Sequence, residues 1–264
     1  MTTLWPVALP SCLTVERQDS IAILSLNRPE KRNALSDELV QGLQAFFGNV
    51  PDDVLAIVVR GEGEHFCAGL DLNELKEPVG VDFNTSMMGQ GLNNTIQYCK
   101  VPVISVLHGA VVGGGLEIAA ASHIRVAEKS AFFALPEGTR GIFLGSGGSV
   151  RLPRLIGVSA VMDMMLSGRV YSAEEAYHHL HLTQYLVEDG EGTDKAIALA
   201  QKVAGNSKLS NYAIIQALPR IADNDANSGL FTEMLMAAIA ENDGDAKKRL
   251  REFLELKMNK VQKS

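Results

Sequence analysis

The stretch that decides the fold is residues 101–127, VPVISVLHGAVVGGGLEIAAASHIRVA. Glycines and a proline interrupt this apolar run, and it contains the charged residue Glu117. A membrane-spanning helix needs ~20 predominantly apolar residues with few or no charges, so this pattern favours a buried segment of a globular protein. We therefore predict a strand over residues 101–107, a turn at residues 113–115 and a helix over residues 116–122.

The segments on either side show a change of pattern along the chain. Short apolar, β-branched runs predict strands before and just after this stretch, whereas helical spacing dominates after Gly145. Ser36 has Asp37 and Glu38 directly after it, which is typical of a helix N-cap. The predicted strands cover residues 12–16, 21–26, 54–59, 124–127 and 131–134, with a turn at 17–20, a helix from 36 to 47, and a loop followed by a helix over 74–98. The later helices cover residues 150–156, 160–166, 173–179, 193–203, 211–221, 229–240 and 245–260.

This order of elements predicts an α/β core followed by helices alone. The chain has 264 residues, of which 46% are hydrophobic and 21% charged, which is ordinary for a globular protein and excludes disorder. Apolar residues on the last predicted helix, Leu250, Phe253 and Leu254, indicate a surface that oligomerisation would cover.

Charge and cysteine content exclude several function classes. Lys and Arg number 24 against 31 Asp and Glu, a formal charge of −7, so the chain has no excess of positive charge for binding nucleic acid. The cysteines, Cys12, Cys67 and Cys99, form no C-x-x-C pair, so we expect reduced thiols and neither a zinc site nor disulfides. Residues 1–10 have no charged n-region or long apolar h-region, and we therefore expect a cytoplasmic protein.

The three glycines followed by Glu117 are the strongest candidate for chemistry. Glycines after a strand let the backbone approach a ligand closely, and the first N–H groups of the next helix have no intrahelical partner. Such groups can hold a developing oxyanion, with the Glu117 carboxylate nearby. The alternative is a tight strand–helix junction in which Glu117 only stabilises the helix dipole.

Glu137 is the second candidate. It follows an apolar strand and Pro136, and its neighbours include Phe133 and Ile142. Burial among such residues would raise its pKa toward the range of a proton donor. The alternative is an ordinary loop glutamate that pairs with Arg140.

Other motifs are incomplete. The chain has no G-x-G-x-x-G after a predicted strand and no phosphate-binding P-loop, and Ser146 lacks the first glycine of a nucleophile elbow. His178, His179 and His181 lie close in sequence, but their spacing on a helix seldom converges on one metal, and we expect none to be bound.

Four segments together resemble the enoyl-CoA hydratase/isomerase, or crotonase, superfamily. They are residues 26–35, LNRPEKRNAL, residues 66–72, FCAGLDL, residues 108–115, HGAVVGGG, and residues 134–137, ALPE. Their order and spacing match the family over about residues 11–190. The resemblance implies a core of repeated ββα units over residues 1–196 and a C-terminal helical region over residues 197–264 that forms a homotrimer or a dimer of trimers.

The resemblance also implies an acyl-CoA thioester as substrate, with no metal and no cofactor besides the CoA that the substrate carries. Matched residue by residue, the backbone N–H groups that grip the thioester oxygen belong to Leu70 and Gly114, and the acid/base residues are Glu117 and Glu137. Glu117 would activate water and Glu137 would handle the α-proton, or both would hold the same water. The other residues matched to CoA contacts are Lys31, Arg32, Ala34, Ala68, Asp71 and Leu72.

Glutamate at both matched positions is typical of hydratases, so we expect a short 2-enoyl-CoA to be hydrated. Residues 137–151 resemble a branch that includes methylthioacryloyl-CoA hydratases. We expect residues 74–98, with Met87 and Met88, to line the acyl end. The pair Leu180–His181 departs from the Gly-Leu that relatives often carry. Alternatives are thioester hydrolysis, double-bond isomerisation and, in another class, an RNA-binding homologue, which the charge of −7 and the absence of Lys and Arg from residues 36–47 disfavour.

Overall fold

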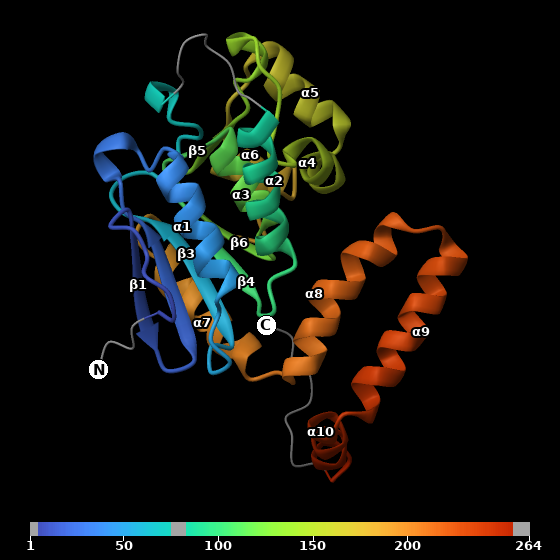
Figure 1. Cartoon of the computed structure of the whole chain (residues 1–264). Helices are drawn as coiled ribbons and strands as arrows, with labels where there is room; N and C mark the ends of the chain where they lie inside the picture. Colours follow the sequence, from blue (N-terminus) through green and yellow to red (C-terminus); the bar gives the residue numbers. More distant parts are fainter. Residues whose placement is uncertain (1–4, 75–82, 256–264) are drawn as a thin grey trace.

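A computed structural model describes residues 5–74 and 83–255 of the chain, and its main element is a six-stranded sheet (Figure 1). Its strand order is β1-β2-β3-β4-β6-β9, and every neighbouring pair is parallel except β1 with β2, which form an antiparallel hairpin. The strands are β1 (Leu13–Gln18), β2 (Ile21–Leu26), β3 (Ala56–Gly61), β4 (Val103–Leu107), β6 (Ile124–Glu128) and β9 (Tyr185–Val187).

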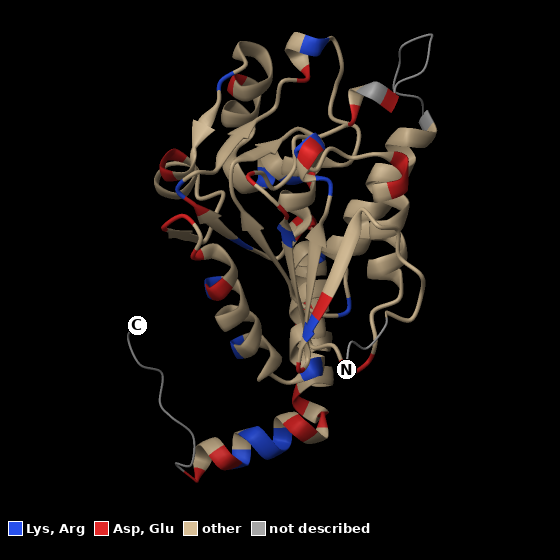
Figure 2. Ribbon diagram, turned by 90° about the vertical axis from the view of Figure 1, so that its left-hand side faces the viewer, with Lys and Arg blue, Asp and Glu red and all other residues tan. Residues whose placement is uncertain are grey.

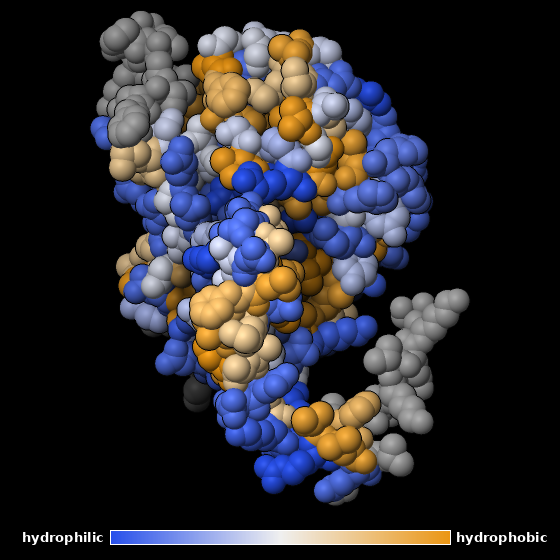
Figure 3. Space-filling view, turned by 90° about the vertical axis from the view of Figure 1, so that its right-hand side faces the viewer, coloured by the Kyte–Doolittle hydropathy of each residue, from blue (hydrophilic) through white to orange (hydrophobic). Residues whose placement is uncertain are grey.

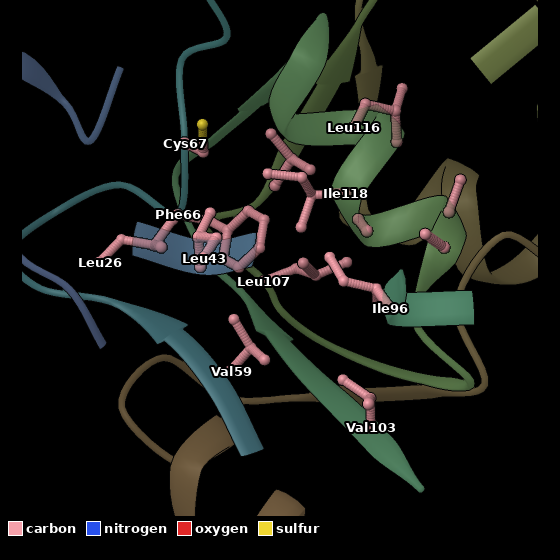
Figure 4. Close-up of a cluster of buried hydrophobic side chains, with 14 of the residues drawn as sticks. Leu26, Leu43, Val59, Phe66, Cys67, Ile96, Val103, Leu107, Leu116 and Ile118 are labelled. Atoms are coloured by element: carbon pink, nitrogen blue, oxygen red, sulfur yellow. The ribbon is translucent and has the colours of Figure 1, made fainter. Parts of the chain in front are cut away.

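Helices cover both faces of this sheet, so its central strands are apolar on both sides. On β2, Ala22 and Leu24 project from one face of the sheet, here called the first face, into the larger apolar cluster. Ile21 and Ile23 project from the other face into a separate apolar cluster. The first face carries α1 (Asp37–Gly48), α2 (Phe83–Gln97) and α3 (Gly114–Ala121), and the second carries α7 (Gly192–Ala204). Figure 4 shows part of the larger core, to which Phe66, Leu107 and Ile118 all belong.

A smaller sheet continues the first face toward the candidate site. It has the order β5-β7-β8, with β5 (Ala110–Val112), β7 (Phe132–Ala134) and β8 (Tyr171–Ser172). Isolated bridges join Cys67 to Val111 and Leu35 to Leu70. Segments 31–35, 67–71 and 110–115 therefore run next to one another, although they are far apart in the sequence.

The remaining helices lie outside these layers. In Figure 1, α4 (Gly148–Ile156), α5 (Val158–Ser167) and α6 (Ala173–His178) cluster near α3, whereas α8 (Lys208–Asp223) and α9 (Ala226–Asn242) form a hairpin that projects from the body. The last helix, α10 (Gly244–Leu254), carries both signs of charge (Figure 2). Short 3₁₀ turns cover Pro29–Lys31, Leu72–Glu74 and Gly138–Arg140.

The structure confirms the α/β class, and it corrects several details. The expected series of helices alone after residue 145 is wrong, because β8 and β9 are both strands and β9 extends the main sheet. β5 was also not predicted. These strands have two or three residues, too few to show an alternating pattern. The turn predicted at residues 17–20 is shorter, since β1 continues to Gln18.

Helix bounds agree more closely with the sequence. Ser36 caps α1, with its hydroxyl accepting a hydrogen bond from the Leu39 N–H at 3.2 Å. Residues 75–82 and 256–260, which the predicted segments 74–98 and 245–260 include, lie outside the described residues. The division at residue 196 stays a prediction; α7 spans it and packs on the main sheet. Among the described helices, none has the length and hydrophobicity that crossing a bilayer requires.

Candidate active site

Glu117 reaches the site through the junction between β5 and α3. Gly113 adopts a positive φ of +54° as the N-cap of α3, and the helix begins at Gly114, two residues before the predicted start. A Cβ on Gly113 would lie 2.9 Å from the Glu137 Oε1, and one on Gly115 would overlap the carbonyl oxygen of Cys67. Glycine at both positions thus lets this backbone pack directly against two other segments of the site.

Two backbone N–H groups meet next to this junction, those of Leu70 and Gly114. A Cβ built on Gly69 lies 3.4 Å from the Gly114 nitrogen, and one built on Gly114 lies 3.9 Å from the Leu70 nitrogen. Within the described residues, neither N–H donates a hydrogen bond to the protein, and both residues line the same cavity. Unsatisfied, converging N–H groups in a cavity can stabilise an oxyanion.

An ion pair holds the Leu70 loop in place. The Arg28 guanidinium donates to the Asp71 carboxylate at 2.8 Å and to the Ala34 carbonyl at 2.6 Å, and the Asp71 side chain is only 4% exposed. Backbone bonds add to this, because the Leu35 N–H donates to the Gly69 carbonyl and the Asp71 N–H donates to the Leu35 carbonyl. The position of the Leu70 N–H is therefore fixed from both sides.

Glu117 is buried, yet it is held as a hydrogen-bond acceptor. Its Oε1 accepts from the N–H groups of Ser146 at 2.9 Å and Gly148 at 2.7 Å. Burial raises the pKa of Glu117 from 4.5 to about 6, while these two bonds oppose the rise. When Glu137 is ionised, its charge adds to the rise, whereas the Arg151 charge lowers the pKa of Glu117. A carboxyl with such a pKa is mostly ionised at pH 7, so it can accept a proton.

Glu137 follows β7, and its side chain is buried at 7% exposure. Its Oε2 has no hydrogen-bond partner among the described residues, and no ion pair with Arg140 forms there. Burial raises the pKa of Glu137 above its ordinary value, and the nearby Arg140 charge partly offsets this. The alternative of a simple loop ion pair therefore does not describe this residue, and a buried carboxyl with a raised pKa can donate a proton.

One cavity brings these groups together. Glu117, Glu137, Leu70 and Gly114 all line it. Its apolar wall includes Leu35, Val40, Met88, Leu92, Ile118 and Leu144. Met88 is thus in the wall as predicted for segment 74–98, whereas Met87 is 55% exposed and is not part of the lining.

Of the other residues predicted to contact CoA, Leu72 lines the cavity, whereas Lys31, Arg32, Ala34, Ala68 and Asp71 are not part of its lining. The Ala68 N–H donates to the Arg32 carbonyl at 3.0 Å, so the two predicted segments are adjacent. Lys31, Arg32 and Leu72 are exposed and Ala34 and Ala68 are half-buried, so these five side chains lie along a surface that a ligand can reach. The buried Asp71 carboxylate instead binds Arg28.

Residues that sequence reasoning missed complete the site. Ser146 and Gly148 supply the two N–H groups at Glu117, although Ser146 was considered only as a nucleophile. The available signal was the pair Gly147–Gly148 just before a predicted helix, a second glycine-rich helix start like that of α3. Among the described residues, no cluster of three or more His, Cys, Asp or Glu side chains is arranged to hold a metal, and α6 ends at His178.

Comparisons with known proteins identify relatives of this chain. The family model described as enoyl-CoA hydratase/isomerase matches residues 16–262. A solved structure of a provisionally named enoyl-CoA hydratase from Rhodopseudomonas palustris CGA009 is 52% identical, with a TM-score of 0.89, and the match covers 95% of this chain and 97% of that one.

Two curated relatives extend this similarity at lower identity. A probable enoyl-CoA hydratase from Bacillus subtilis (strain 168) is 32% identical over 89% of this chain and 92% of its own length. A short-chain-enoyl-CoA hydratase from Clostridium acetobutylicum is 29% identical over 91% of this chain and 94% of its own length.

Proposed function

Because this chain belongs to the enoyl-CoA hydratase/isomerase family, we propose that it adds water across the C2–C3 double bond of a short 2-enoyl-CoA thioester. One observation carries the proposal: two buried glutamates with raised pKa values and two unsatisfied backbone N–H groups line one cavity. Hydration needs these functions, since the oxygen of the thioester gains charge while one proton leaves water and another reaches C2.

The N–H groups of Leu70 and Gly114 would bind the thioester oxygen. When water attacks C3, electron density moves through C2 onto this oxygen, and an enolate forms. The N–H groups stabilise that charge because they have no protein partner and are already oriented toward the cavity. These hydrogen bonds are strongest when the oxygen carries the most negative charge, as it does in the enolate-like transition state. They therefore accelerate the reaction and do not merely bind the substrate.

The two glutamates would then divide the proton transfers. Ionised Glu117 takes a proton from the attacking water, while its Oε1 stays bound to the Ser146 and Gly148 N–H groups. Protonated Glu137 gives its proton to C2, and the product is a 3-hydroxyacyl-CoA. After product release, exchange with solvent returns Glu117 to its ionised form and Glu137 to its protonated form. No metal or added cofactor takes part in these steps.

The proposed acyl group is short. The wall residues Met88, Leu92 and Leu144 give an apolar surface to the acyl end, and the relative from Clostridium acetobutylicum carries a short-chain name. Crotonyl-CoA is the simplest such substrate, and methylthioacryloyl-CoA is the second that we propose, since the flexible thioether of Met88 can adapt to a sulfur-containing chain.

Product analysis tests this proposal. The protein is incubated with crotonyl-CoA and, separately, with methylthioacryloyl-CoA, and the products are separated by chromatography while a thiol reagent reports free CoA. Accumulation of 3-hydroxyacyl-CoA without free thiol is the expected result with crotonyl-CoA. Free CoA as the main product would mean thioester hydrolysis, a shifted double bond would mean isomerisation, and either would overturn the proposal.

The proposed assembly is a homotrimer or a dimer of trimers in the cytoplasm. Large apolar side chains on the projecting helices are exposed, and Figure 3 shows hydrophobic residues gathered on this side of the molecule. Burying them against copies of the same chain would remove this surface from water. They are Ile214 and Leu218 on α8, Leu230, Phe231, Met234, Leu235 and Ile239 on α9, and Leu250, Phe253 and Leu254 on α10.

A further inference from the structure

Arg151 on α4 is a buried cation with uncharged partners. Arg151 is only 8% exposed. Its Nε donates to the Gln97 Oε1 at 2.6 Å, and its Nη2 donates to the Asn94 Oδ1 at 2.6 Å. Its Nη1 donates to the Ser146 carbonyl at 3.4 Å. Within the described residues, Arg151 forms no ion pair with a carboxylate. Burying a charge without a counter-ion is costly, so its retention needs an explanation.

The guanidinium contacts the short loop that binds Glu117. A Cβ on Gly147 would overlap the Arg151 Nη1, so the guanidinium lies directly against this glycine, which has a φ of +91°. The Ser146 carbonyl also accepts from the Asn93 Nδ2 at 2.9 Å. The carbonyl of Ser146 thus points to α2 and Arg151, and its N–H points to Glu117.

Gly147, which contacts the Arg151 guanidinium, lies between the two residues whose N–H groups bind Glu117. Ser146 and Gly148, which flank Gly147, donate both of the hydrogen bonds that Glu117 Oε1 accepts. A change in the position of Gly147 would therefore move both donors at once. The Arg151 charge also favours the ionised form of Glu117, because it lowers the pKa of that carboxyl.

We propose that Arg151 is a positioning residue for the reaction: bound to Gln97 and Asn94 of α2, it holds the loop 146–148 in the position from which its N–H groups bind Glu117. This inference rests on the proposed role of Glu117 as the base that activates water.

The other charged groups near Glu117 do not replace this cation. Glu137, which follows β7, raises the pKa of Glu117, and the side chains that α2 contributes to this region, Asn93, Asn94 and Gln97, are uncharged. Asp37 at the start of α1 and Arg140 after β7 line the same cavity. Arg140 acts on Glu137, where its charge lowers the pKa.

The test compares Arg151→Gln and Arg151→Lys with the parent over a pH series, using hydration of crotonyl-CoA. For Arg151→Gln we expect kcat to fall between about 10- and 100-fold, as misplaced catalytic groups do, with KM changed less than about threefold. We expect the acid limb of kcat/KM to move up by at least about half a pH unit, because a favourable charge is lost. Arg151→Lys should keep the acid limb near the parent's position, since it keeps the charge.

Arg154→Gln is the matched control, because Arg154 lies on the same helix but is exposed and pairs with Asp223. It should leave both kcat and the acid limb unchanged. If Arg151→Gln does not fold, Asn94→Ala removes one guanidinium partner at an exposed position, and it should shift kcat and the acid limb in the same direction.

A second readout separates this inference from the proposed function. The carboxyl carbon of Glu117, assigned with Glu117→Gln, can be titrated by ¹³C NMR in the parent and in Arg151→Gln. A higher pKa of Glu117 in the variant supports the role of Arg151 even if the parent does not hydrate enoyl-CoA. An unchanged pKa of Glu117, or unchanged kcat in a folded Arg151→Gln protein that hydrates crotonyl-CoA in its parent form, would overturn it.

Discussion

Replacing Glu117 by Gln should change turnover and stability in opposite directions. Glu117 is 4% exposed, and burial raises its pKa from 4.5 to about 6. Ionisation therefore costs about 2 kcal/mol more in the folded protein than in the unfolded chain. Gln cannot ionise, and it keeps an oxygen for the Ser146 and Gly148 N–H groups. We expect kcat to fall at least about 100-fold, while the free energy of unfolding at pH 7 rises by up to about 2 kcal/mol.

The pH dependence of this gain follows from the two pKa values. Below the unfolded value near 4.5, the carboxyl is protonated in both states, and the parent pays no penalty. Between 4.5 and about 6 the unfolded chain ionises first, so the parent loses stability relative to Glu117→Gln. Above about 6 both states are ionised, and the difference stays constant.

The assay is urea unfolding of both proteins at one protein concentration, from pH 4 to pH 8, with hydration followed in the same preparations. Glu64→Gln, at an exposed position after β3, is the control, and it should change the free energy of unfolding by less than about 0.5 kcal/mol. The reasoning would be refuted if the difference in the free energy of unfolding between Glu117→Gln and the parent were the same at every pH. It would also be refuted if Glu117→Gln became less stable relative to the parent as pH rises.

Four further predictions address the cavity and the assembly. Gly114→Pro removes one oxyanion donor and should lower kcat by ~10²–10³-fold; Gly114→Ala keeps the N–H while adding the same Cβ contact with Leu35, so similar losses in both would argue against a donor role. The kcat/KM of the parent should fall to about half near pH 6 and about a tenth at pH 5, because Glu117 must be ionised, and a flat profile would contradict this. The kcat of Glu137→Gln should also fall at least about 100-fold. The double variant with Glu117→Gln should have a kcat only slightly lower than either single variant, because both residues serve one step. Near-parental hydration by Glu137→Gln would exclude the two-glutamate mechanism. Light scattering should give the mass of a trimer or hexamer, and a monomer at micromolar concentration would contradict the proposed assembly.

The sequence determined the elements whose signals are local. Ser36 followed by two acidic residues specifies a helix start because the cap bonds within the next turn. Continuous apolar runs specify β2, β3 and β4 because both faces of these strands are buried. The three glycines before Glu117 likewise marked a close backbone approach, since side chains would collide there.

The tertiary structure alone decided how distant segments meet. Leu70 lies in the loop after β3 and Gly114 at the start of α3, and their N–H groups become neighbours only because the bridges of Leu35 with Leu70 and of Cys67 with Val111 set the register. The burial of Glu137, which raises its pKa, and the hydrogen bonds of Glu117 to the loop before α4 depend equally on packing.

The role of Arg151 shows most clearly what local sequence patterns cannot predict, because its partners Gln97 and Asn94 are 54 and 57 residues away in the sequence. A helical arginine in a polar segment is normally solvent-exposed, and no local pattern marks this one as buried. Hydrogen bonds and electrostatic interactions depend on distance in space, whereas capping and periodicity depend on distance along the chain. The sequence therefore indicated which residue types could carry the chemistry, and only the packing of α2, α3 and α4 decided which of them act together.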